Sequence, residues 1–293
     1  MAHVGVGGGS LGEFAVSAAQ WVGGRERQED AFLAELIGIE ESGTIGALFG
    51  VADGMGGETA GDLASRLGLE AFVAAFRASS IRDSSERLVA ALNSANDAIK
   101  RAIEDSPDRV GMGTTMLVCY ALAERLYWAS VGDSVLLLLR DRRVRRLNAD
   151  HSYGAMKRML APQRSALEEE NPDNALLSYV NGSEIELIDA PAEGFELRPG
   201  DVVVAATDGL ESLCDADVLH CLEGGSSGFA RRLVERVRAL DVPNQDNVTV
   251  VVLGIEEPRR AKDPRAASWY ARMLRHPWRR LLSARPALSA SCA

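Results

Sequence analysis

Short apolar runs separated by turn residues recur along most of the chain. Two longer stretches, 58–78 and 85–103, instead repeat apolar residues every three or four positions, which predicts amphipathic helices. Shorter helical patterns follow around 216–221 and 228–239. The apolar runs have the length of strands, and they predict β-strands at 14–21, 31–37, 45–52, 114–121, 125–131, 135–140, 143–147, 184–188, 201–207 and 247–255.

The order of these elements predicts the fold class. Strands and helices come in separate runs, without the regular strand–helix–strand alternation of a parallel sheet. This order is typical of an α+β fold with antiparallel sheets. Turn signals separate the four short strands between 114 and 147, so we expect an antiparallel meander there. Residues 154–180 are polar and irregular, with weak helical patches.

Composition divides the chain into three parts. Residues 1–13 contain a run of three glycines and are expected to form a flexible N-terminal lead. Residues 14–257 carry the predicted strands and helices and are expected to form one domain. Residues 258–293 hold nine Arg and Lys residues but a single acidic residue, which indicates a separate basic C-terminal tail.

The basic tail interleaves arginines with bulky apolar residues between Trp269 and Leu282. Such a sequence can dock on an acidic protein surface, of this chain or of a partner, or lie weakly on an anionic membrane. A disordered end is the alternative, since composition constrains chain termini only loosely. We expect the tail to localise the protein and to be dispensable for its chemistry.

Charge and cysteine content exclude several classes of protein. The formal net charge of -10 argues against general nucleic-acid binding. The four cysteines fit no zinc spacing and suggest no disulfide framework, so we expect a reducing, cytoplasmic compartment. The N-terminus lacks a basic region followed by an apolar run, which argues against a signal peptide. The longest apolar run, 135–139, is too short to span a bilayer.

Four acidic turns stand out next to the predicted strands. Asp53 and Asp208 each end an apolar run and precede a glycine, and Asp246 lies just before another run. The pair Glu29-Asp30 directly precedes a fourth apolar run. Each pair alone is explained by ordinary turn chemistry. Together, carboxylates held at the ends of buried strands would form an oxygen-lined site for hard divalent cations.

Seven short motifs occur in the order found in one enzyme family. Over roughly residues 14–255 the chain resembles the bacterial PP2C-like (PPM) metal-dependent protein serine/threonine phosphatases. The motifs that carry the resemblance are Arg25-Glu26-Arg27-Gln28-Glu29-Asp30, Val51-Ala52-Asp53-Gly54-Met55-Gly56-Gly57, Gly113-Thr114-Thr115, Gly132-Asp133-Ser134, Asp150-His151-Ser152, Thr207-Asp208-Gly209-Leu210 and Asp246-Asn247-Val248-Thr249-Val250.

The resemblance implies a fold and a metal site. PP2C-like enzymes fold as a four-layer α-β-β-α sandwich, with two antiparallel sheets between helical layers and the metals at one end. By motif, Asp53 would bridge two ions, Mn²⁺ or Mg²⁺, and Gly54 would offer its backbone carbonyl to one of them. Asp208 and Asp246 would complete the shell of the other ion.

Further roles follow from the same resemblance. Glu29 and Asp30 would hold metal-bound waters, and Arg25 would clamp the substrate phosphate with its fork-shaped guanidinium. Asp133 resembles an aspartate that can bind a third, weaker ion in bacterial members. A plain β-turn is an equally good reading of Asp133. An ordinary surface arginine is the alternative for Arg25.

The chain departs from the family pattern at three places. Met55 replaces the histidine proposed as general acid in some members, although bacterial members commonly carry this methionine. Val135 follows the Gly132-Asp133-Ser134 motif where the family usually has arginine, which we expect to alter local packing. Residues 154–180 correspond to the flap beside the active site and match the family poorly.

The implied activity is hydrolysis of phosphoserine and phosphothreonine in proteins by a metal-bridging hydroxide. We expect a monomer whose partners are phosphorylated proteins, among them a bacterial Ser/Thr kinase and its targets. One alternative is a pseudophosphatase that binds phosphoproteins without turning them over. Another is a regulatory phosphatase of an anti-sigma-type partner switch, although the sensor domains common in such proteins are not evident in this sequence.

Overall fold

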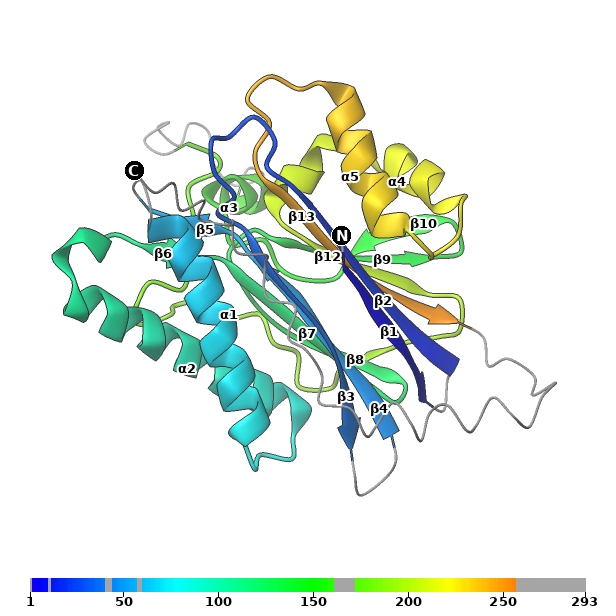
Figure 1. Cartoon of the computed structure of the whole chain (residues 1–293), viewed down its shortest axis with the longest axis horizontal. Helices are drawn as coiled ribbons and strands as arrows, with labels where there is room; N and C mark the ends of the chain where they lie inside the picture. Colours follow the sequence, from blue (N-terminus) through cyan, green and yellow to red (C-terminus); the bar gives the residue numbers. More distant parts are fainter. Residues whose placement is uncertain (1, 10–11, 40–43, 57–59, 161–171, 257–293) are drawn as a thin grey trace, which may run out of the picture.

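Two antiparallel β-sheets pack face to face, with helices on both outer faces (Figure 1). The computed structural model describes residues 2–9, 12–39, 44–56, 60–160 and 172–256. This arrangement confirms the predicted α+β class and the four-layer α-β-β-α sandwich. Within the described residues, no helix is long and apolar enough to cross a membrane.

The described strands are divided between the two sheets. The first sheet has the order β1 (Ala2–Gly9), β2 (Gly12–Trp21), β13 (Val248–Glu256), β12 (Val202–Ala206), β9 (Val135–Arg140) and β10 (Arg143–Arg146). The second has the order β11 (Phe195–Glu196), β8 (Arg125–Val131), β7 (Met116–Leu122), β4 (Thr44–Ala52) and β3 (Ala31–Ile39). A small ribbon pairs β5 (Gly54–Met55) with β6 (Gly113–Thr114).

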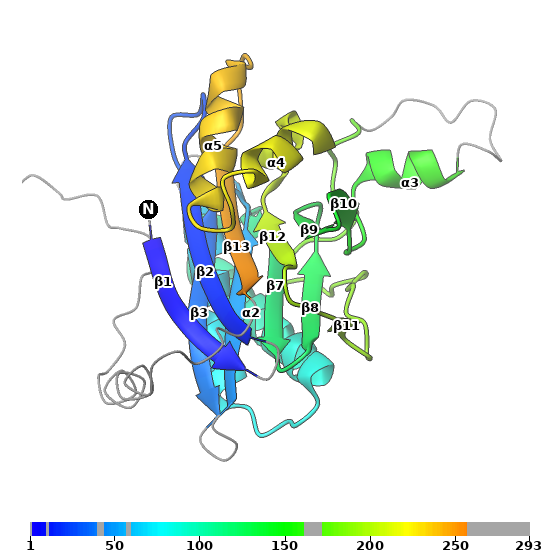
Figure 2. The same ribbon diagram turned by 90° about the vertical axis from the view of Figure 1, so that its right-hand side faces the viewer.

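Helices cover the outer face of each sheet (Figure 1). The second sheet carries α1 (Ala60–Ala78) and α2 (Ser84–Asp105), while the first carries α4 (Asp215–Leu222) and α5 (Phe229–Leu240). The 3₁₀ turns η1 (Pro107–Arg109) and η3 (Asp208–Ser212) follow α2 and β12. Figure 2 shows α3 (Tyr153–Leu160) standing out from the body of the sandwich.

Three apolar layers hold these elements together. Phe49 and Leu136 belong to the layer between the sheets, Phe72 to the layer beneath α1 and α2, and Phe229 to the layer beneath α4 and α5. All four side chains are fully buried. A strand such as β12 is therefore buried on both faces, which explains why its sequence is continuously apolar and not alternating.

The antiparallel registers bring many strand ends to one edge of the sandwich. In the second sheet, Ala52 at the end of β4 faces Ala31 at the start of β3. In the first sheet, Ala206 at the end of β12 faces Val135 at the start of β9. The turns that follow or precede these residues therefore meet at the same edge, and those turns carry the acidic motifs.

The prediction that the four strands between 114 and 147 form one antiparallel meander is wrong. Strands β7 and β8 pair in the second sheet, whereas β9 and β10 pair in the first. The chain changes sheets at Gly132, whose φ of 104° favours glycine. A Cβ atom there would lie 2.6 Å from Thr115 Cγ2. Local sequence predicts a strand but not its partner, because both sheets offer the same apolar environment.

Two further expectations are corrected. Within the expected flexible lead 1–13, Ala2–Gly9 forms β1, which pairs with β2, because backbone hydrogen bonds need no large side chains. The expected strand at 184–188 joins no sheet. There the Leu187 amide donates to Ser178 Oγ (3.2 Å) instead of a neighbouring strand. The sequence pattern does not predict strand β11. The basic tail 258–293 lies outside the described residues.

Candidate active site

Asp53 is the first residue beyond β4, and its backbone is hydrogen-bonded on both sides. Its amide donates to Thr115 Oγ1 (2.9 Å). Its carbonyl accepts from the Thr115 amide (2.9 Å) and from Thr114 Oγ1 (2.8 Å). These bonds join the end of β4 to Thr114 in β6 and to Thr115, which lies between β6 and β7. They hold the Asp53 backbone where the strand ends converge.

Gly54 lies in a space that no other residue fits. A Cβ atom at this position would lie 2.0 Å from the carbonyl oxygen of Gly61 and 2.7 Å from that of Glu29. The Gly54 amide donates to the Glu29 carbonyl (3.2 Å), and Ser65 Oγ donates to the same oxygen (2.5 Å). This close packing brings the Glu29-Asp30 turn against the end of β4 and the first turn of α1.

Asp30 is buried and only half satisfied. Its Oδ2 accepts from Thr207 Oγ1 (2.9 Å) and Thr249 Oγ1 (2.7 Å), while its Oδ1 has no hydrogen-bond partner. Burial raises the pKa of Asp30 to about 7, and the charges of Asp208 and Asp246 add to this rise. The sequence pattern alone assigns no role to these two threonines. Their signal in the sequence is a hydroxyl within or beside an otherwise apolar strand.

Asp53, Asp133 and Asp208 gather around the same edge. Burial raises the pKa of Asp53 well above its usual range, and Asp30, Asp208, Asp133 and Asp246 each raise it further. Burial and Asp208 raise the pKa of Asp133 to about 7. The pKa of Asp208 is also raised, by burial and then by Asp246, and its Oδ1 is buried without a partner. Carboxyl groups are therefore concentrated at this edge, where burial and their neighbours disfavour their ionised forms.

Arg25 lies against Asp246 at the exposed rim. Its Nη2 is 2.6 Å from Asp246 Oδ2, and the two side chains are 55% and 38% exposed. The arginine expected to bind phosphate thus contacts an aspartate expected to bind metal. Burial raises the pKa of Glu29, although Arg25 opposes that rise.

Asn247 holds the loop that carries these residues, a role that sequence reasoning missed. Its Nδ2 donates to the carbonyls of Val22 (2.7 Å) and Arg27 (3.0 Å). Its Oδ1 accepts from the Glu29 amide (2.7 Å). The only signal in the sequence is an amide side chain directly after Asp246.

The structure brings together all eight predicted site residues, which are Arg25, Glu29, Asp30, Asp53, Gly54, Asp133, Asp208 and Asp246.

The chemistry of this edge fits hard divalent cations. Its donors are carboxylate and carbonyl oxygens, and two buried carboxylate oxygens, Asp30 Oδ1 and Asp208 Oδ1, lack partners. Among the described residues, no three His, Cys, Asp or Glu side chains are grouped as ligands of one ion. Mg²⁺ typically keeps several waters and takes only one or two protein carboxylates, so the site can suit such an ion without three converging side chains.

Comparison with known protein families and sequences agrees with this geometry. A family model described as protein phosphatase 2C matches residues 25–247. The chain is 33% identical over 222 residues to the serine/threonine protein phosphatase PstP of Mycobacterium tuberculosis, which covers 74% of this chain but 42% of that relative. It is 27% identical over 213 residues to the protein phosphatase PhpP of Streptococcus pneumoniae, covering 71% and 85% of the two chains. The chain thus spans less than half the length of the mycobacterial relative.

Solved structures extend this similarity to three dimensions. The crystal structure of Mycobacterium tuberculosis PstP matches with a TM-score of 0.68 and 30% identity, covering 83% of this chain and 99% of that one. A structure of the PstP catalytic domain in complex with two manganese ions matches with a TM-score of 0.68 and 29% identity, over the same shares of the two chains. By its fold, its convergent acidic turns and the extent of the family match, this chain belongs to the protein phosphatase 2C family.

Proposed function

We propose that this chain hydrolyses phosphoserine and phosphothreonine in proteins, opposing a Ser/Thr kinase. The observation that carries the proposal is the group of buried carboxylates at one edge of the sandwich, with two unpartnered oxygens. Such a group is costly to bury unless cations compensate its charge. The relative PstP, named as a serine/threonine protein phosphatase, supports the substrate class.

Four residues would hold two Mn²⁺ or Mg²⁺ ions. Asp53 would contact both, the Gly54 carbonyl would contact one, and Asp208 and Asp246 would contact the other. When bound, the ions supply positive charge that neutralises the phosphoryl oxygens and lowers the pKa of water. The manganese-bound structure of PstP supports this choice of metal.

The remaining site residues would act on water, phosphate and an additional ion. Glu29 and Asp30 would accept hydrogen bonds from waters in the cation shell and so orient them. Arg25 would turn its guanidinium from Asp246 toward two oxygens of the substrate phosphate. Asp133, whose neighbour is Asp208, would hold a third and weaker ion. Met55 has no proton to donate, so the leaving group would take its proton from a water.

Removing divalent cations should abolish turnover. Protein dialysed against excess chelator should hydrolyse neither p-nitrophenyl phosphate nor a phosphothreonine peptide, and added Mn²⁺ or Mg²⁺ should restore both activities. The reason is that the described site residues offer carboxylate and carbonyl oxygens, which suit a hard cation, whereas the thiol of Cys119 is fully buried in β7. Turnover that persists in chelator would refute the metal-dependent mechanism. Binding of phosphopeptide without turnover in Mn²⁺ would indicate a pseudophosphatase.

Replacing Arg25 by alanine should weaken handling of the phosphate group. We expect kcat/KM to fall by about tenfold to a hundredfold, which corresponds to roughly 1.4–2.7 kcal/mol. Lysine should restore only part of the loss, because its single ammonium cannot bind two oxygens as a fork. The control is Arg77→Ala, which removes a comparably exposed ion pair with Glu35. Equal kcat/KM for Arg25→Ala and wild type would remove Arg25 from the site.

A further inference from the structure

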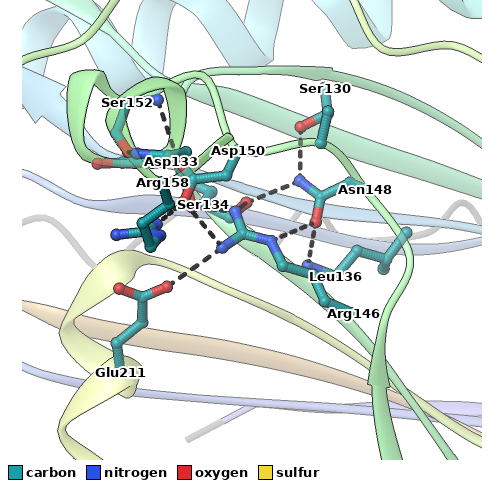
Figure 3. Close-up of polar contacts among 12 residues, drawn as sticks. Ser130, Asp133, Ser134, Leu136, Arg146, Asn148, Asp150, Ser152, Arg158 and Glu211 are labelled. Carbon is teal, nitrogen blue, oxygen red and sulfur yellow. Dashed lines mark hydrogen bonds and ion pairs between the residues drawn. The ribbon is translucent and has the colours of Figure 1, made fainter. Parts of the chain in front are cut away.

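Arg146, the last residue of β10, lies at the centre of a polar network beside the site (Figure 3). Its Nη2 donates to the backbone carbonyl of Asp133 (2.8 Å) and lies 3.4 Å from that of Ser134. Its Nη1 lies 3.4 Å from Asp150 Oδ2 and 3.3 Å from Glu211 Oε1. One guanidinium therefore contacts the Asp133 turn, the segment before α3 and the turn that follows Asp208.

Asn148 holds the same turn together with Arg146. Its Oδ1 accepts from the Leu136 amide (2.8 Å). Its Nδ2 donates to Ser130 Oγ (2.9 Å) and to the Ser134 carbonyl (2.8 Å). Arg146 Nε lies 3.4 Å from Asn148 Oδ1, so the two side chains form one unit. The Asp133 backbone is thereby held between the end of β8 and the start of β9.

The network also reaches α3 through Asp150. Asp150 Oδ2 contacts Arg146 and, at 3.1 Å, Nη2 of Arg158, which lies on α3. Asp150 Oδ1 accepts from the Ser152 amide (3.0 Å) just before the helix begins. The carboxylate of Asp150 is 17% exposed, so solvent screens its ion pairs only partly. Arg146 thus connects the helix that stands out from the sandwich to the turn that carries Asp133.

The position of Arg146 is also relevant to Val135, which stands where the family usually has arginine. Val135 is 4% exposed and packs in the apolar layer beneath α4 and α5. Val135, Arg146 and Glu211 line one cavity of about 340 Å³. The positive charge beside the Gly132-Asp133-Ser134 motif therefore comes from β10 in this chain. Since Arg146 lines an open cavity and is itself 26% exposed, its truncation leaves space that water can fill.

We propose that Arg146 is a positioning residue that holds the Asp133 turn and ties it to α3 through Asp150. It acts through the backbone of Asp133, whose carbonyl accepts its hydrogen bond, and so fixes the position of the Asp133 side chain near Asp208. This inference rests on the proposed function, in which Asp133 binds the weakest of the divalent cations. Loss of Arg146 should therefore weaken that cation and leave the two cations at Asp53 in place.

Mn²⁺ binding to the full chain, measured by titration calorimetry without substrate, tests this role. Arg146→Ala should weaken the weakest class of bound Mn²⁺ at least about tenfold, as Asp133→Asn should, and leave the tighter class unchanged. The affinity of Arg146→Lys for the weakest class of Mn²⁺ should lie between those of the wild type and Arg146→Ala, because an ammonium cannot reach all five acceptors of the guanidinium at once. The control is Arg145→Ala. The guanidinium of Arg145 lies over the ring of Phe195, 5.8 Å from the ring centroid. That variant should bind Mn²⁺ as the wild type does.

The double variant Asp133→Asn/Arg146→Ala completes the test. If Arg146 acts through Asp133, the double variant should bind Mn²⁺ no more weakly than Asp133→Asn alone. Independent effects, or wild-type binding in Arg146→Ala, would overturn the inference. So would a wild-type protein that binds two ions and no weaker third, with the proposed function left standing. If Arg146→Ala does not fold, Arg146→Lys replaces it in the same comparison of single and double variants. A wild-type protein that binds no Mn²⁺ would instead refute the proposed function.

Discussion

Asp208→Asn should lower kcat at least about a hundredfold, a barrier increase of roughly 2.7 kcal/mol, while the protein stays folded. Asp53→Asn should do the same. Each substitution keeps the shape of the side chain but removes a negative charge from the group that would hold the cations. Burial and Asp246 raise the pKa of Asp208, so its ionised form is disfavoured in the metal-free protein. The asparagine variant should accordingly be no less stable in chelator.

A second aspartate near β12 provides a matched control. Asp201 directly precedes this strand and Asp208 follows its end, and Asp201 accepts from Arg140 at 2.6 and 2.7 Å. Asp201→Asn breaks this pair, in which the aspartate is 1% exposed, and should cost about 1–3 kcal/mol of stability without changing kcat in saturating Mn²⁺.

The two variants should therefore show opposite patterns, one losing activity and the other stability. Steady-state kinetics on p-nitrophenyl phosphate and urea denaturation would measure both. An Asp208→Asn enzyme that keeps more than about a tenth of the wild-type kcat, a change of less than 1.4 kcal/mol, would show that Asp208 does not hold a catalytic ion.

In chelator, the free energy of unfolding should fall as the pH rises from about 5 to 8. Burial raises the pKa of Asp30 from 3.8 to about 7 in the folded protein, so the folded state binds a proton more tightly than the unfolded chain. The stabilisation from this proton is complete below the unfolded pKa and is lost as the pH passes through the folded pKa. Between pH 5 and the folded pKa of about 7, this loss is at most about 3 kcal/mol. Asp133, whose pKa is also raised to about 7, contributes in the same direction.

Asp30→Asn isolates one part of this pH dependence. The asparagine oxygen can still accept from Thr207 and Thr249, but the side chain carries no charge at any pH. The variant should lose less stability between pH 5 and 8 than the wild type, and should be the more stable of the two at pH 8. Urea denaturation in chelator at both pH values measures the difference.

Added Mn²⁺ should restore the stability that the wild-type protein loses at pH 8. A cation compensates ionised carboxylates, so its binding to the folded state should raise the free energy of unfolding. The same addition should help Asp30→Asn less. A wild-type protein that becomes more stable from pH 5 to 8 in chelator would show that these carboxyls are ionised without cost, contrary to the structure.

The sequence by itself determined most of the elements and the chemical character of the site. Apolar periodicity placed α1, α2 and most of the strands within a few residues, since burial of an amphipathic face is a local pattern. The motifs around Asp53, Asp208 and Asp246 identified the family, because each carries its residues within a short stretch. Their roles as ligands stay predictions.

Only the tertiary structure decided which side chains meet. Asp30 contacts Thr207 across 177 residues of sequence and Thr249 across 219. The local pattern of apolar residues carries no information about contacts between residues so far apart in the sequence. For the same reason the sequence did not show that the chain changes sheets at Gly132, or that Arg146 reaches the Asp133 turn. Burial of a strand depends on its own residues, whereas its partners depend on how the whole chain packs.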